Sequence, residues 1–133
     1  MACIYKDISI DAHPEDVWAA VRDFNAVHHR LARGFVLDCK PDGDARIVTF
    51  VSGNIVRELL VDIDDQRRRL AYAIVNERFK HHSASIQVFA DGDSRTRLVW
   101  TADLLPNDIA PYIEAQTDLG VAAMQKTFSR NAA

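Results

Sequence analysis

The chain has 133 residues, of which 48% are hydrophobic and 26% charged, with a formal net charge of −3. These values are typical of one globular domain with a single core. They argue against a nucleic-acid partner held by overall positive charge, and no apolar run approaches the ~20 residues of a membrane-spanning helix.

The N-terminal stretch and the cysteines indicate the compartment. Residues 1–10 lack the long apolar core of a signal peptide. Cys3 and Cys39 form no CxxC pair, which favours free thiols in a reducing compartment, although a disulfide between them is an open alternative. We therefore expect a cytoplasmic protein.

The first half of the chain begins with a strand and two helices. Polar and apolar residues alternate over residues 4–12, which predicts a half-buried strand. Pro14 and the two acids after it suit the first turn of a helix. A second short helix is expected over residues 25–32, ended by Gly34. Six strands with short turns between them follow, at residues 35–40, 46–51, 55–63, 70–76, 82–90 and 96–104.

Residues 108–130 form the longest segment with helical periodicity. Asp108 is placed to cap this helix, Pro111 suits its first turn, and Lys126 and Arg130 complement its negative end. A helix of this length spans roughly 33 Å, comparable to a ten-residue strand. Small residues at the centre of its apolar face indicate either close packing on a sheet or a hollow beneath the helix. That face comprises Ile109, Tyr112, Ile113, Ala115, Leu119, Ala122, Ala123, Met124 and Phe128.

The order of these elements predicts the architecture. Consecutive strands joined by short turns indicate an antiparallel meander, which is usually buried on one face only. Only the long helix is large enough to cover that face. We therefore predict one α+β domain over residues 1–133, in which a curved antiparallel sheet of six to seven strands wraps around the C-terminal helix.

Three stretches resemble a known superfamily. They read ISIDAHPEDVWAAVRDF (residues 8–24), VRELLVDIDDQRRRLAYAI (56–74) and TRLVWTADLLP (96–106). Their order and spacing resemble the START and birch-pollen-allergen superfamily, in particular its bacterial polyketide cyclase/dehydrase branch, the SRPBCC proteins. The resemblance implies the helix-grip fold, with a cavity for apolar small molecules between sheet and helix. Because that superfamily includes carriers, hormone receptors, cyclases and hydrolase-like members, it implies a site more firmly than a reaction.

Two places depart from the family pattern. Many relatives carry a Trp-Pro pair after the second helix, where this chain reads His28-His29-Arg30-Leu31. The plant abscisic-acid receptors share the hairpin pattern but carry a longer gating loop where this chain has only residues 51–54. The short turn argues against a gate of the hormone-receptor type.

Glu58 is the first candidate site residue, and two arguments about it disagree. Strand alternation puts it on the less apolar face, pointing outward, where Arg46 or Arg57 can pair with it. The resemblance instead implies that the glutamate of this motif lines the cavity. A β-bulge near Asn54 would shift the register and reconcile the two. Inside the cavity, a carboxylate would be a candidate acid or base.

The other candidates lie on the following strands and the last helix. Tyr72 matches the aromatic residue of the family hairpin and can offer a ring and a hydroxyl. His82 precedes the alternating apolar residues Ala84, Ile86 and Val88, so it lies either at the cavity mouth or in solvent. At the mouth it could bind a ligand oxygen or act as an acid or base. The remaining expected ligand-binding residues are Trp100, Tyr112, Gln116, Leu119 and Ala123.

The sequence contains no metal or cofactor motif. The two histidine doublets, at residues 28–29 and 81–82, place neighbouring rings in different directions on a helix or strand. HxH, HExxH, a nucleophile elbow and a phosphate-binding glycine loop are all missing. We therefore expect neither a metal nor a cofactor.

Three functions are compatible with these features. The preferred one is binding of a small, largely apolar ligand that is polyketide-, lipid- or aromatic-like. The second is a cyclase or dehydratase in which Glu58 and His82 are the candidate catalytic residues. The third is a protein-interaction module with a filled core. The chain can act as a monomer or as a homodimer in any of these roles.

Overall fold

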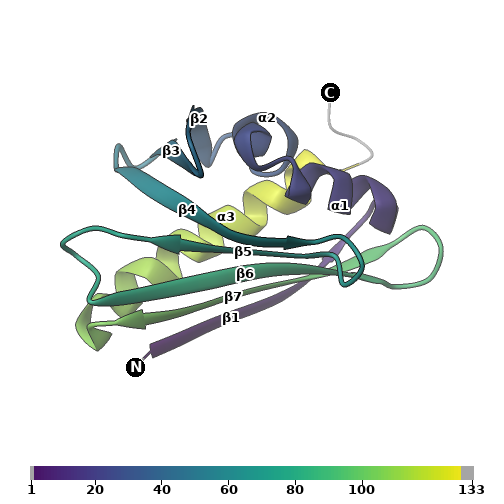
Figure 1. Ribbon diagram of the computed structural model, residues 1–133. Coiled ribbons are helices and arrows are strands. Elements are labelled where there is room, and N and C mark those ends of the chain that lie inside the picture. Colours follow the sequence, from purple (N-terminus) through teal and green to yellow (C-terminus); the bar gives the residue numbers. More distant parts are fainter. Residues whose placement is uncertain (1, 130–133) are drawn as a thin grey trace.

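A computed structural model describes residues 2–129 (Figure 1). It contains one antiparallel sheet in the order β1-β7-β6-β5-β4-β3-β2. The strands are β1 (Ala2–Ile10), β2 (Val36–Asp42), β3 (Ala45–Phe50), β4 (Ile55–Asp64), β5 (Arg69–Ile74), β6 (His81–Ala90) and β7 (Thr96–Leu105). The helices are α1 (Pro14–Arg22), α2 (Val27–Arg30) and α3 (Ala110–Thr127), with 3-10 turns η1 (Phe24–Ala26) and η2 (Asn107–Ile109). The predicted helix-grip α+β fold is confirmed.

The sheet is a meander whose first strand returns to the last. Each strand from β2 to β7 pairs with the next, as short turns require, and β1 pairs with β7 at the far edge. The long helix α3 crosses one face of the curved sheet, and α1 and α2 cover the same side toward one end (Figure 1). None of the helices in residues 2–129 is long and apolar enough to cross a membrane.

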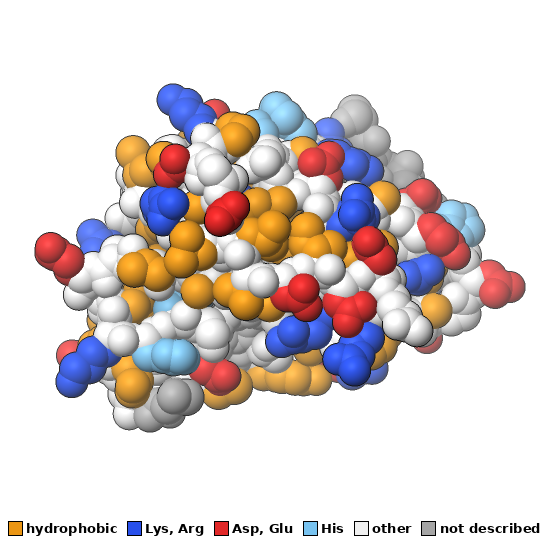
Figure 2. Space-filling view, viewed as in Figure 1, with side chains coloured by type: hydrophobic (Ala, Val, Ile, Leu, Met, Phe, Trp, Pro, Cys, Tyr) orange, Lys and Arg blue, Asp and Glu red, His pale blue; other side chains and the backbone are white. Residues whose placement is uncertain are grey.

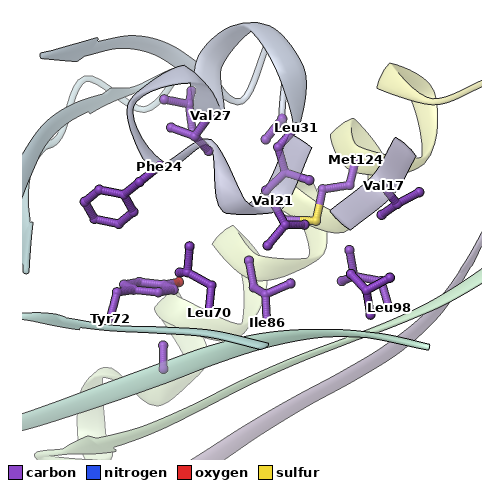
Figure 3. Close-up of a cluster of buried hydrophobic side chains, with 14 of the residues drawn as sticks. Val17, Val21, Phe24, Val27, Leu31, Leu70, Tyr72, Ile86, Leu98 and Met124 are labelled. Carbon is purple, nitrogen blue, oxygen red and sulfur yellow. The ribbon is translucent and has the colours of Figure 1, made fainter. Parts of the chain in front are cut away.

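A solid core fills the end of the molecule beneath α1. Val17 and Val21 point from α1 toward the sheet, where they meet Leu70 and Leu98 (Figure 3). Met124 reaches the same cluster from α3. Trp18 and Arg22 both donate hydrogen bonds to the Asp65 carboxylate in the β4–β5 turn, and these bonds fix α1 against the sheet.

The outer face of the sheet is not covered by any helix. Hydrophobic side chains gather in a band across the middle of this face, over β4 and β5 (Figure 2). Among the exposed large hydrophobic residues are Ile55 and Val61 in β4 and Val75, which directly follows β5. Cys3 is exposed and Cys39 is buried, and both are free thiols.

The start of α3 differs from the prediction. The helix begins at Ala110, after the 3-10 turn η2, and no side chain caps it. The predicted Asp108 cap is therefore wrong, because Asp108 lies inside that turn. Arg130, predicted to end the helix, lies outside the described residues.

The predicted broad apolar face of α3 is only partly buried. Thr117, Gly120 and Met124 are its buried residues, a narrow stripe with a spacing of three and four. Leu119, predicted to face inward, is 52% exposed. The stripe is narrow because the first half of α3 faces a hollow instead of packed side chains.

The solid core generates a prediction about stability. Leu98 is 0% exposed, so Leu98→Ala should lower the free energy of unfolding by about 2–5 kcal/mol. Leu119→Ala, on the exposed side of α3, should change it by about 0.5 kcal/mol or less. Urea denaturation measures both values, and equal losses would contradict the assigned core.

Candidate functional site

A cavity of about 470 Å³ lies between the first half of α3 and the inner face of the sheet. This volume falls within the range of small-molecule sites, about 300–1,000 Å³. Most of its wall is apolar, and six lining residues carry aromatic rings. These are Phe35, Phe50, Tyr72, Phe79, Trp100 and Tyr112.

Three segments meet at the cavity mouth. They are the β3–β4 turn, the β5–β6 loop and the start of α3, which lie at the same end of the molecule (Figure 1). The Asn54 side-chain amide donates to the Tyr112 hydroxyl at 2.6 Å, and Arg78 donates to Asn54 Oδ1 at 3.5 Å. A polar rim therefore surrounds an apolar interior.

A buried ion pair forms part of the cavity wall. Arg46 and Glu58 are 6% and 5% exposed, and they are direct partners across β3 and β4. Arg46 Nε and Nη2 both lie 2.8 Å from Glu58 Oε1. Arg46 Nη1 donates to the Phe24 carbonyl at 2.6 Å, and the guanidinium lies 4.0 Å from the Phe24 ring centroid. These partners offset the cost of burying two charges.

The inward direction of Glu58 agrees with the family resemblance and contradicts strand alternation alone. The β4–β5 register shifts between Leu60 and Asp62, so Val61 is an extra residue at this point. The shift returns Ile63 to the core side. Strand alternation had counted Ile63 on the face opposite Glu58, which made that face the more apolar one by count and therefore the one predicted to be buried. The bulge predicted near Asn54 lies here instead.

Tyr72 and Trp100 form a second polar element of the wall. Trp100 Nε1 donates to the Tyr72 hydroxyl at 3.0 Å. Burial, and then the charge of Glu58, raise the pKa of Tyr72 above its ordinary value of 10.0, so the hydroxyl stays protonated.

Gly120 on α3 allows the Trp100 indole to lie directly against the helix. A Cβ at this position would lie 2.8 Å from Trp100 Cζ3, which is too close for a side chain.

His82 does not line the cavity. Its Nδ1 accepts the Ile74 backbone N–H at 3.0 Å, and its ring lies 5.0 Å from Phe79 and 6.1 Å from Tyr72 between centroids. Burial, and then the neighbouring His81, lower the pKa of His82 to about 4. The expected position at the mouth is not observed, and the proposed catalytic role of His82 has no geometric support.

The other predicted residues divide between wall and surroundings. Glu58, Tyr72, Trp100, Tyr112 and Gln116 all line the cavity. Leu119 points away from it, because it lies on the exposed side of α3, and Ala123 packs against the core instead. Their roles in binding a ligand remain predictions.

Sequence reasoning missed several members of the wall and rim. Arg46 was considered only as a surface partner of Glu58, although it alternates with Val48 and Phe50, which both line the cavity. That alternation was the available signal. Asn54 and Arg78 lie in turns, where no periodicity indicates which way a side chain points.

Among residues 2–129, no group of three or more His, Cys, Asp or Glu side chains is placed to hold a metal ion.

Comparison with known families identifies the class of protein. Residues 1–133 match the family described as polyketide cyclase / dehydrase and lipid transport. The chain therefore belongs to this family, and the resemblance stated from its motifs is confirmed. No curated protein matches the chain at a significant level.

Solved structures share the fold over nearly the whole chain. XoxI from Bacillus cereus has a TM-score of 0.84 at 22% identity, covering 96% of each chain. A START superfamily protein from Mycobacterium smegmatis has a TM-score of 0.70 at 12% identity, covering 98% of this chain and 96% of its own. Norcoclaurine synthase from Thalictrum flavum, in complex with dopamine and hydroxybenzaldehyde, has a TM-score of 0.70 at 17% identity, covering 96% and 83%.

The buried ion pair generates a prediction. Glu58→Gln leaves Arg46 charged and unpaired, so the free energy of unfolding should fall by about 3–5 kcal/mol. Asp42→Asn, which removes one partner of the exposed Asp42–Arg57 pair, should cost less than about 1 kcal/mol. The joint change Arg46→Met with Glu58→Met should restore most of the loss. Denaturation curves of the three variants test this, and similar losses for Glu58→Gln and Asp42→Asn would contradict it.

The lowered pKa of His82 generates a prediction about pH. Between the ordinary pKa of 6.5 and the folded pKa of about 4, the unfolded chain binds a proton that the folded chain does not. The free energy of unfolding should therefore fall as pH falls through this window. His82→Gln should reduce the slope, because glutamine can accept the Ile74 N–H without titrating. Urea denaturation between pH 7 and 4 measures both slopes, and equal slopes would contradict the assignment.

Proposed function

We propose that this protein binds a small, largely apolar ligand in the cavity between α3 and the sheet. The observation that carries the proposal is the cavity itself, with its volume of about 470 Å³ and its largely aromatic and aliphatic wall. Burial of apolar ligand surface supplies the main driving force in such a site, and a few polar groups set orientation. A protein-interaction module with a filled core would have no such space.

Family membership supports the same proposal. The family description includes lipid transport, and norcoclaurine synthase, which shares the fold, binds two small aromatic molecules in its described complex. The ligand class that we propose is polyketide-, lipid- or aromatic-like. In this role the protein is a carrier or a sensor of the ligand and does not convert it.

A second candidate function is an acid/base enzyme of the cyclase or dehydratase type. The observation that favours it is that two polar side chains, Glu58 and Tyr72, line the same apolar cavity. Glu58 would accept a proton and Tyr72 would donate a hydrogen bond to the reacting oxygen. Turnover of a bound ligand that is lost in Tyr72→Phe would favour the enzyme, whereas binding without turnover favours the carrier.

Ligand binding is tested by filling the cavity. Ile113 lines the cavity from α3, so Ile113→Trp should occupy part of the space. Leu119→Trp is the matched control, because Leu119 lies on the exposed side of the same helix. The melting temperature is measured by circular dichroism against flavonoids, aromatic polyketides, fatty acids, sterols and hormone-like acids.

A ligand that binds only the folded state raises the melting temperature in a saturable manner. We expect such a rise for at least one apolar compound with the unmodified protein and with Leu119→Trp. In Ile113→Trp, the concentration of that compound that gives half of the maximal rise should be at least tenfold higher. No rise with any compound, or an equal rise in all three proteins, would contradict the proposal.

A further inference from the structure

Glu58 presents a hydrogen-bond acceptor to the cavity. Its Oε1 lies 2.8 Å from Nε and from Nη2 of Arg46, and within residues 2–129 no hydrogen bond is found to its Oε2. Oε2 is also accessible. If it were fully buried it would be a buried oxygen without a partner, and among residues 2–129 the only fully buried side-chain nitrogen or oxygen without a partner is His28 Nδ1. Since Glu58 lines the cavity and is almost completely buried, the free oxygen faces the cavity space.

Tyr72 presents a hydrogen-bond donor to the same space. Its oxygen accepts the Trp100 indole N–H, which leaves the hydroxyl hydrogen to be donated. No acceptor for that hydrogen is found among residues 2–129. The indole also fixes the tyrosine ring, so the direction of the donor is set before a ligand binds.

The residues that carry the acceptor and the donor are neighbours on the sheet. Leu60 is opposite Tyr72 and Glu58 is opposite Ile74, so Glu58 and Tyr72 are diagonal neighbours on the inner face of β4 and β5. Diagonal neighbours are about 7–8 Å apart, within reach of long side chains. One ligand hydroxyl placed between their tips can donate to Glu58 Oε2 and accept from Tyr72.

The charges of the wall indicate the charge of the ligand. Inside the cavity, Arg46 is neutralised by Glu58. The remaining charged residues of the lining are one cation, Arg78, and one anion, Asp108, so the charges of the lining sum to zero. A ligand carboxylate would find no excess positive charge and would be repelled by Glu58 Oε2. The aromatic rings of the wall match a flat, uncharged partner.

We propose that the cavity selects uncharged aromatic molecules that carry a hydroxyl group, bound with that hydroxyl between Glu58 and Tyr72. This selectivity rests on the proposed function, because it concerns the same cavity. It separates phenol-like ligands from fatty acids and other carboxylates, which the fold alone does not distinguish.

Four matched probes test the selectivity. They are naphthalene, 2-naphthol, 2-methoxynaphthalene and 2-naphthoate, which share one ring system and differ in the polar group. Quenching of protein fluorescence gives each dissociation constant at pH 7. A hydrogen bond to a charged group outweighs the water it replaces, so 2-naphthol should bind about tenfold tighter than 2-methoxynaphthalene. 2-Naphthoate should be the weakest of the four.

Two variants assign the preference to the named side chains. Joint Arg46→Met and Glu58→Met should bring the ratio between 2-naphthol and 2-methoxynaphthalene close to one while naphthalene still binds. Tyr72→Phe should reduce the ratio by a smaller factor, because it removes the hydroxyl donor but leaves the charged acceptor Glu58 in place. Asp42→Asn is the control and should leave the ratio unchanged, because that carboxylate lies in an exposed pair outside the cavity.

The outcomes distinguish this inference from the proposed function. If all four probes bind with similar affinity to the unmodified protein, the hydroxyl preference is refuted and the cavity function stands. If the double variant keeps the tenfold ratio, the position of the hydroxyl beside Glu58 is refuted, and the cavity function again stands. If none of the four binds, the preference for hydroxylated aromatic molecules is refuted, and the cavity function fails as well only if the wider panel of apolar compounds also produces no rise in melting temperature. The comparison on the unmodified protein decides the matter even if a variant does not fold.

Discussion

A single helix cannot fill the space beside a seven-stranded sheet. Seven strands span about 29 Å across the sheet, at about 4.8 Å per spacing. The 18-residue helix α3 is about 27 Å long but only about 10 Å wide. Curvature of the sheet and the short helices α1 and α2 close the gap at one end, where the core is solid. At the other end, no side chain of residues 2–129 fills the gap, and the cavity is the result.

That hollow determines which polar groups the interior can hold. A charged pair next to an apolar space needs further partners besides its opposite charge, because both charges have lost most of their contact with water. Arg46 has the Glu58 carboxylate, the Phe24 carbonyl and the Phe24 ring, and these contacts join β3 and β4 to the turn before α2. Trp100 orients Tyr72 in the same way from β7. The polar groups that face the cavity are therefore held in place by the surrounding residues, and such preorganisation favours selective binding.

Much of the fold followed from sequence periodicity. The seven strands and three helices were predicted within a few residues, because alternation and turn residues act locally. The direction of Glu58 did not follow, because an extra residue at Val61 shifts the register, and strand alternation assumes a regular strand. The resemblance corrected this error, since it compares whole motifs.

The site was harder to predict than the fold. Tyr72, Trp100 and Gln116 line the cavity as expected, whereas the His82 side chain turns to cap the Ile74 N–H instead. The rim residues Asn54 and Arg78 meet only because three separate turns converge, which is a property of the topology and not of any local pattern. Leu119 was misassigned because the buried stripe of α3 is narrow, with Thr117, Gly120 and Met124 as its buried residues, so a hydrophobic residue outside this stripe is exposed.

The most direct test of ligand binding in the cavity is to locate a bound ligand by NMR of the methyl groups. The protein is titrated with 2-naphthol, and the shifts of isoleucine and valine methyl signals are followed. The account predicts shifts at Val48, Ile86 and Ile113, which line the cavity, and none at Ile10 or Val17 in the solid core. Shifts confined to Ile55, Val61 and Val75 would place the ligand on the outer face of the sheet and contradict the cavity as the binding site.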